Sequence, residues 1–222
     1  VRRVMASCSN RLLDYPSRRI RMTGITGTNG KTTVAHILDS ILSLEGPSLL
    51  LGTVRTKIGS TLEEAGLTTP ESVDLHRLLD RAVRMGVGHG VMEVSSHSLA
   101  FDRVFGIDFP TAVFTNLTAD HLDFHKDLEE YFSVKSLLFD PAYNQGLQQS
   151  VVNIDDRFGL RLAAKTPGEV ISYGLAAGAD IFPSTFESGI DGISLQLETP
   201  AGPCRVRSRL CGKHNLYNIM AA

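Results

Sequence analysis

Residues 24–33, GITGTNGKTT, combine glycines with a lysine and two threonines in the order typical of a phosphate-binding loop. An apolar strand pattern precedes them and an amphipathic helical pattern follows. The glycines let successive N–H groups turn toward an anion, and the helix start adds partial positive charge. Lys31 would reach the terminal phosphates, and the Thr32 hydroxyl would bind magnesium. Ile25 stands where the common motif has a small residue, which indicates a variant loop. An ordinary glycine-rich turn is the alternative interpretation.

Glu93 lies near the end of an apolar run at residues 89–95. An unpaired carboxylate would be expensive to bury there, so it is expected to have a partner. A magnesium ion is the first hypothesis, because Mg²⁺ prefers oxygen ligands. A salt bridge to a lysine is the alternative.

Residues 116–125, NLTADHLDFH, place two histidines and two aspartates within six positions. Both residue types bind metals. The alternative is a loop with capping side chains, in which Asp123 or Asp127 starts the next helix. Zinc is conceivable, but no cysteine lies nearby and a phosphate site favours magnesium. Lys135 lies 14 residues beyond His121, so the two can meet only if the chain turns between them.

Six short apolar runs predict the strands that must position these residues. Most are almost continuously apolar, which is typical of parallel strands buried on both faces by helices. The predicted strands are 20–26, 48–54, 89–95, 111–117, 150–155 and 169–174. Helical periodicity predicts helices at 34–42, 75–83 and 127–139, and a fourth after Asp155 and Asp156, which could cap it. Polar residues after the first four strands, including 53–57, should then share one edge of the sheet, where ligands bind in such folds.

From about residue 178 to 211 the pattern changes to short alternating segments separated by Gly and Pro, which predicts a small antiparallel sheet. The predicted fold class is therefore α/β: a mostly parallel sheet of the phosphate-loop type, with helices on both faces and an antiparallel β lobe near the C-terminus.

The composition argues against some classes of function. The chain has 222 residues, 42% of them hydrophobic, and a net charge of −2, so no global positive field favours nucleic acid or an anionic membrane. Its three cysteines form neither a disulfide framework nor a zinc pattern, and no apolar run could span a bilayer, so a cytoplasmic protein is expected. The first residue is Val and the last helical pattern is not capped, which suggests a piece of a longer protein.

Several motifs together resemble the Mur ligases in order and spacing. Besides the loop at 24–33 they are TTPES at 68–72, MEVSSHSLAFDR at 92–103, TNLTADHLDFH at 115–125, YFSVKSLLF at 131–139, VVNIDD at 151–156 and GKHNLYNIMAA at 212–222. The resemblance implies a three-domain enzyme. Residues 1–19 would be the linker from an N-terminal UDP-binding domain and residues 20–222 the central ATP-binding domain, with an amino-acid-binding domain beyond.

The resemblance also implies ATP-driven amide formation: a substrate carboxylate takes the γ-phosphate, and an amino group attacks the acyl phosphate. The chain is most similar to members that add the third residue of the stem peptide. The implied small-molecule partners are UDP-muramoyl dipeptide, an amino acid and ATP with Mg²⁺, without nucleic acid or membrane. The amino acid, meso-diaminopimelate or L-lysine, and the oligomeric state stay open. The alternatives are a sister ligase, such as one that adds glutamates to folate, and a relative that binds ATP without turnover.

By position in these motifs, the implied residues fall into four groups. The catalytic positions match Lys31, Glu93, His121 and Lys135. The ATP-binding positions match Thr28, Asn29, Gly30, Lys31, Thr32, Thr33 and Asn215, with Asn218 as a further candidate. The substrate-binding positions match Thr68, Thr69, Ser95 and Arg103. The metal positions match Thr32, Glu93, His121 and Lys135, the last if carbamylated; a free Lys135 that pairs with ATP or Glu93 is the alternative. Phe101 departs from relatives in which a glutamine touches the substrate.

Overall fold

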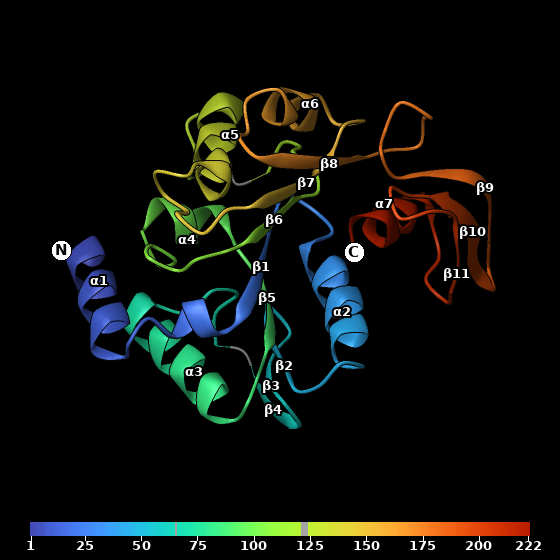
Figure 1. Cartoon of the computed structure of the whole chain (residues 1–222). Coiled ribbons are helices and arrows are strands. Elements are labelled where there is room, and N and C mark those ends of the chain that lie inside the picture. The colour runs from blue at the N-terminus through green and yellow to red at the C-terminus, as the bar shows by residue number, and fades with distance from the viewer. Residues whose placement is uncertain (65, 121–123) are drawn as a thin grey trace.

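The computed structural model describes residues 1–64, 66–120 and 124–222, and its centre is an eight-stranded sheet (Figure 1). The strands lie in the order β4 (Thr61–Glu64), β3 (Arg55–Ile58), β2 (Ser48–Leu51), β5 (His89–Glu93), β1 (Arg21–Thr26), β6 (Thr111–Phe114), β7 (Gln149–Asn153) and β8 (Glu169–Tyr173). The six strands from β2 to β8 are parallel, which confirms the predicted parallel sheet.

Strands β3 and β4 form an antiparallel extension at one edge of the sheet, and the sequence did not predict them. All four residues of β4 are exposed, so this strand lacks the apolar signal on which the prediction of strands relied. The second strand, β2, ends at Leu51 rather than at residue 54.

Helices cover both faces of the sheet, as predicted (Figure 1). One face carries α2 (Lys31–Leu42) and α7 (Lys213–Ala221). The other carries α3 (Ser72–Arg84), α4 (Ser96–Ala100), α5 (Leu128–Ser136), the 3₁₀ turn η2 (Leu137–Phe139) and α6 (Arg157–Ala163). Helix α1 (Arg2–Leu12) and the 3₁₀ turn η1 (Pro16–Arg19) pack against α3.

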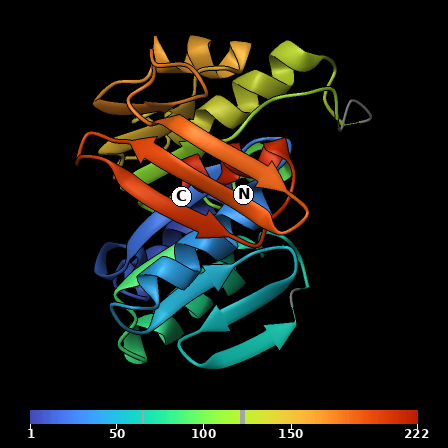
Figure 2. The same cartoon turned by 90° about the vertical axis from the view of Figure 1, so that its right-hand side faces the viewer.

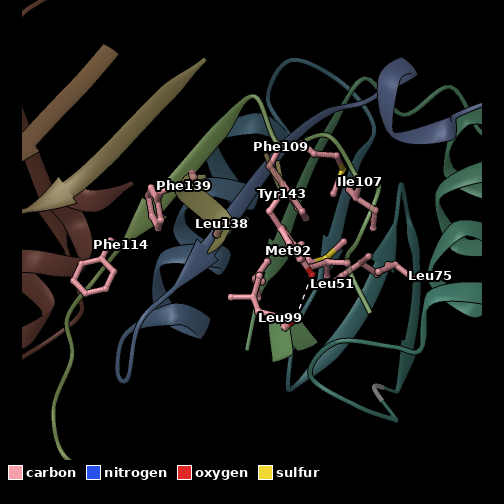
Figure 3. Close-up of a cluster of buried hydrophobic side chains, with 14 of the residues drawn as sticks. Leu51, Leu75, Met92, Leu99, Ile107, Phe109, Phe114, Leu138, Phe139 and Tyr143 are labelled. Carbon is pink, nitrogen blue, oxygen red and sulfur yellow. Dashed lines mark hydrogen bonds between the residues drawn. The ribbon is translucent and has the colours of Figure 1, made fainter. Parts of the chain in front are cut away.

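The apolar strands serve both layers because adjacent side chains alternate between the two faces. In β2, Leu49 and Leu51 belong to the core on the α3 side and Leu50 to the core on the α2 side. The α3-side core is rich in aromatic rings, and the Tyr143 hydroxyl donates to the Leu99 carbonyl within it at 3.3 Å (Figure 3).

A separate three-stranded antiparallel sheet confirms the predicted lobe near the C-terminus (Figure 2). Its strands are β9 (Phe182–Gly189), β10 (Gly192–Glu198) and β11 (Cys204–Ser208). Alternate residues of β10, namely Ile193, Leu195 and Leu197, are buried in the same core as Leu216 and Ile219 of α7. The lobe is thereby packed on the α2 side of the molecule. Among the described residues, no helix is long and apolar enough to cross a membrane.

Candidate active site

The glycine-rich loop runs from β1 to α2, which is the strand–loop–helix context that the sequence predicted. Two of its glycines have positive φ, +144° at Gly27 and +89° at Gly30. A Cβ atom on Gly30 would lie 2.3 Å from Oδ1 of Asn218, and one on Gly27 would lie 1.9 Å from Oγ1 of Thr115. No larger residue fits at either position, and the loop leads directly into the N-terminus of α2.

The segment after β6 hydrogen-bonds to the backbone of the glycine-rich loop. The Asn116 side chain accepts from the Asn29 backbone N–H at 2.9 Å and donates to the Asn29 carbonyl at 3.1 Å. The Thr28 N–H donates to the Asn116 carbonyl at 2.8 Å, and the Thr115 hydroxyl donates to the Asn29 carbonyl at 2.6 Å. The sequence placed polar residues at this sheet edge, but nothing in it indicated that Thr115 and Asn116 support the loop, since the contacts span nearly 90 positions.

Lys31 and Lys135 meet at the loop. The Lys31 ammonium donates to the carbonyls of Gly27 at 2.9 Å and Thr28 at 2.7 Å. Lys135, from α5, is 1% exposed and donates to the Gly27 carbonyl at 2.8 Å. Burial lowers the pKa of Lys31 and lowers that of Lys135 further, where the charge of Lys31 adds to the effect. Unmodified Lys135 thus binds the loop backbone.

Glu93 ends β5 beside the start of α2 and is 1% exposed. Its carboxylate accepts from the Thr32 hydroxyl at 2.8 Å, the Thr53 N–H at 2.9 Å and the Thr53 hydroxyl at 3.1 Å. In the described part of the chain these groups, rather than a lysine ion pair, satisfy the carboxylate. Its charge is still close enough to raise the pKa of Lys31 against the effect of burial.

Thr32 and Glu93 together offer hydroxyl and carboxylate oxygens beside the loop, the donor set that Mg²⁺ prefers. Within residues 1–64, 66–120 and 124–222, no group of three His, Cys, Asp or Glu side chains could hold a metal ion. The two oxygen donors of Thr32 and Glu93 fit an ion whose other ligands are phosphate and water.

The four expected substrate-binding residues lie around Glu93. The buried Thr69 hydroxyl donates to the Glu93 carbonyl at 2.8 Å, and the Thr68 and Thr53 hydroxyl oxygens lie 3.1 Å apart. Arg103 donates to the Thr69 carbonyl at 3.4 Å and pairs with Glu71 at 2.8 Å.

Ser95 lies two residues beyond Glu93 and caps α4 by accepting from the Ser98 N–H at 3.1 Å. Its partly exposed hydroxyl therefore has a structural role as well.

The histidine-rich segment is described only in part, and His121 and Asp123 lie outside the described residues. Asp127 caps α5 by accepting from the Glu130 N–H at 2.8 Å, as the alternative interpretation of this segment expects for Asp123 or Asp127. Asp156 likewise caps α6, as predicted. His125 is buried, and its ring stacks on Tyr131 with 4.7 Å between ring centroids.

Lys57 departs from the predicted cluster of polar residues at the sheet edge. It lies on β3, which runs back along the sheet, and pairs with Asp39 of α2 at 2.8 Å. Of the residues expected in that cluster, Thr53 contacts Glu93. The others do not follow, because the chain reverses direction immediately after β2.

A cavity of about 500 Å³ opens on the other side of the loop, and its lining includes Gly30, Asn116, Tyr217 and Asn218. Asn215 does not line this cavity. Its side chain accepts from Asn218 Nδ2 at 2.8 Å and donates to the Cys211 carbonyl at 2.8 Å. Asn215 therefore orients Asn218, which faces Gly30.

The sequence and the fold are similar to those of known proteins. The chain belongs to the Mur ligase family, since residues 25–222 match the Mur ligase middle domain. It is 45% identical over 209 residues to the UDP-N-acetylmuramoyl-L-alanyl-D-glutamate--2,6-diaminopimelate ligase of Gloeobacter violaceus, with 94% of this chain and 42% of that protein covered. It is 41% identical over 222 residues to the enzyme of the same name from Solibacter usitatus, with 100% and 45% covered.

A solved structure of a ligase of the same name superposes with a TM-score of 0.86 at 27% identity, over 99% of this chain and 46% of that one. The chain therefore spans less than half the length of these relatives.

Proposed function

We propose that this chain is the ATP-binding part of a cytoplasmic ligase that joins UDP-N-acetylmuramoyl-L-alanyl-D-glutamate to an amino group of 2,6-diaminopimelate during peptidoglycan precursor synthesis. The observation that carries the proposal is the contact of Thr32 with Glu93 at 2.8 Å, directly beside Lys31 and its loop. The names of the relatives, at 41 to 45% identity, support the choice of substrate.

The reaction proceeds in two steps. A carboxylate oxygen of the substrate attacks the γ-phosphorus of ATP, and ADP leaves. The amine then attacks the acyl carbon of the acyl phosphate, phosphate leaves with the C–O bonding pair, and the amine loses a proton. The first step concentrates negative charge on the transferring phosphoryl group, so its barrier falls when cations and N–H groups are already aimed at it.

The loop residues would bind the phosphates. Lys31 would leave the Gly27 and Thr28 carbonyls and reach the β- and γ-phosphates, and the first N–H groups of α2 would face the same oxygens. The loop residues that would form the cradle are Thr28, Asn29, Gly30, Thr32 and Thr33. Asn215 would act through Asn218 at the cavity beside the loop, where the nucleoside would lie.

Thr32 and Glu93 would hold one magnesium ion, and His121 with carbamylated Lys135 a second. When bound, the ions supply positive charge that offsets the charge on the phosphoryl group. The lowered pKa of Lys135 favours the neutral amine, which can attack the carbon of CO₂ and lose a proton to give a carbamate. That change replaces a cation by an anionic oxygen ligand. A free Lys135 that pairs with ATP is the alternative.

Thr68, Thr69, Ser95 and Arg103 would contact the UDP-muramoyl dipeptide. The Arg103 guanidinium is the strongest candidate, because its planar fork suits a carboxylate. The carboxylate would compete with Glu71, which now pairs with it.

The test is ADP release by the full-length protein that contains this chain, assayed with UDP-muramoyl dipeptide and with diaminopimelate or L-lysine. We expect release only when both substrates are present, with diaminopimelate preferred, and loss of release in Lys31→Ala. Lys165→Ala, a change of an exposed lysine in the turn that follows α6, is the matched control. Turnover with L-lysine alone, or with folate and glutamate, would reassign the substrate. ATP binding without substrate-dependent release would identify a non-catalytic relative. Residues 1–222 alone are expected to bind nucleotide without ligation.

A further inference from the structure

Asp156 begins α6, and its two carboxylate oxygens bind different parts of the chain. Oδ1 accepts from the backbone N–H groups of Phe158 at 2.9 Å and Gly159 at 3.2 Å, which caps the helix. Oδ2 accepts from the backbone N–H of Leu117 at 3.0 Å, in the segment after β6. A helix cap needs only one side-chain oxygen. The second oxygen therefore joins α6 to a segment 39 positions earlier in the sequence.

The start of α6 is a fixed point for this contact. A Cβ atom on Gly159 would lie 1.9 Å from the Asn153 carbonyl oxygen, so the first turn of α6 lies directly against the end of β7. The buried Asn153 side chain in turn donates to the Thr115 carbonyl at 2.8 Å. The end of β7 and the start of α6 thus bind the carbonyl of Thr115 and the N–H of Leu117, on either side of Asn116.

Asn116 and Thr118 in this segment hydrogen-bond to the glycine-rich loop. The Asn116 carbonyl accepts from the Thr28 N–H at 2.8 Å, and the Asn116 side chain accepts from the Asn29 N–H at 2.9 Å. The Thr118 N–H donates to the Thr28 hydroxyl oxygen at 3.0 Å. Because all three bonds depend on the position of residues 115–118, a shift of that segment would weaken them together.

We propose that Asp156 is a positioning residue for the glycine-rich loop, which fixes Thr28 and Asn29 through Leu117 and the rest of segment 115–118. Its effect on the loop is indirect, because its own partners are the backbone of Leu117 and of α6. Leu117 is 4% exposed, so loss of the carboxylate would leave its N–H without a ready substitute from water.

The helix cap and the bond to Leu117 can be separated by substitution. In Asp156→Asn the amide oxygen can still cap α6, because asparagine and aspartate are similarly good N-caps. The amide nitrogen that replaces the other oxygen is a donor and cannot accept from Leu117.

Two further variants serve as controls. Asp180→Asn controls for the loss of a carboxylate acceptor, since Asp180 accepts from the Ser172 N–H at 2.8 Å on the edge strand β8. Leu162→Ala controls for general destabilisation, because it removes a buried side chain from the second turn of α6.

Hydrogen–deuterium exchange of the full-length protein without nucleotide, followed by mass spectrometry, measures the effect directly. The Thr28 and Asn29 amides are themselves donors to Asn116. We expect Asp156→Asn to accelerate exchange at residues 27–31 about 3- to 10-fold, the effect of losing one ordinary hydrogen bond, with exchange in α6 close to wild type. Asp180→Asn and Leu162→Ala should leave loop exchange unchanged, and Leu162→Ala should lower the melting temperature.

Loop exchange unchanged in Asp156→Asn, or accelerated equally by Leu162→Ala, would overturn the proposal. If Asp156→Asn does not fold, Asp156→Ser takes its place under the same criteria, since serine also caps helices but lacks the second oxygen.

The meaning of this residue for turnover rests on the proposed function. In the full-length protein, Asp156→Asn should raise the KM for ATP about 3- to 10-fold and change kcat less than that, and Asp180→Asn should change neither. Absence of substrate-dependent ADP release by the wild type would remove the proposed function, whereas the exchange experiment would still test Asp156.

Discussion

Lys31 and Lys135 donate hydrogen bonds to the same carbonyl oxygen, that of Gly27, at 2.9 and 2.8 Å. The two ammonium groups come from different helices, and Lys135 is 1% exposed whereas Lys31 is half-buried. Their mutual repulsion and the cost of burial both favour loss of a proton, and Lys135 is the more deeply buried of the two. Of the two amines around this acceptor, Lys135 therefore favours the neutral form more strongly.

The buried Lys135 should make stability depend on pH. Its pKa is lowered in the folded protein, so the unfolded chain binds more protons between that pKa and the ordinary value near 10.4, and stability rises with pH through this window. Lys135→Met removes the effect. In urea denaturation in CO₂-depleted buffer, the free energy of unfolding of wild type relative to Lys135→Met should rise from pH 7 to pH 10 by about 1.4 kcal/mol per unit of pKa depression within that range. A difference independent of pH would contradict the burial of a titrating lysine.

Glu93→Gln tests the site beside the loop. The amide keeps the shape of the side chain but removes the negative charge that faces the Thr32 hydroxyl. We expect the affinity for Mg-ATP to fall at least about tenfold, or about 1.4 kcal/mol, in calorimetry, and the loss to shrink in titrations with EDTA. Glu64→Gln, on the exposed strand β4, should bind as wild type does. An equal loss with and without magnesium would count against a metal ligand.

Gly30→Ala should damage the loop and the fold together. The residue has φ +89°, and the new methyl group would meet Oδ1 of Asn218. We expect at least about 1 kcal/mol of destabilisation in thermal or urea unfolding, with loss of nucleotide binding. Gly88→Ala, which meets no atom within 4 Å, is the matched control and should cost little. Similar unfolding curves for the two variants would show that the loop relaxes around the methyl group.

His76 should make the fold sensitive to acid. It is fully buried on α3, neither ring nitrogen has a hydrogen-bond partner among the described residues, and burial lowers its pKa to about 4. The unfolded chain takes up the proton near pH 6.5, so stability is lost as the pH falls from 6.5 to 4, by about 3 kcal/mol in all. His76→Leu should flatten this part of the pH profile of urea unfolding. If His76→Leu leaves the low-pH part of this profile unchanged, His76 is not the source of the acid sensitivity.

Much of the fold could be predicted because its signals are local. The buried strands are apolar runs that face a core on both sides, as Leu49, Leu50 and Leu51 do, and Asp156 caps α6 as expected. The hairpin of β3 and β4 could not be predicted, because β4 is exposed throughout and only alternate residues of the four-residue strand β3 are buried. Lys57 illustrates the consequence: without the hairpin it was expected at the site, and it pairs with Asp39 instead.

The loop, Glu93 and Lys135 could be singled out from residue type and motif. Their mutual geometry could not, since it depends on contacts between segments distant in the sequence. Asn116 holds Asn29 from 87 positions away, and Lys135 reaches Gly27 from 108 positions away. An asparagine whose side chain supports a distant loop has no sequence pattern that distinguishes it from any other asparagine in a loop.

The central claim is that the loop around Lys31 binds the phosphates of ATP. Calorimetric titration of Mg-ATP into the full-length protein and into its Lys31→Ala variant tests this most directly, with Lys165→Ala as the control. The account predicts binding by wild type and by Lys165→Ala, and a loss of at least about tenfold, or about 1.4 kcal/mol, in Lys31→Ala. Equal affinity in wild type and Lys31→Ala, or no binding by the wild-type protein, would contradict it.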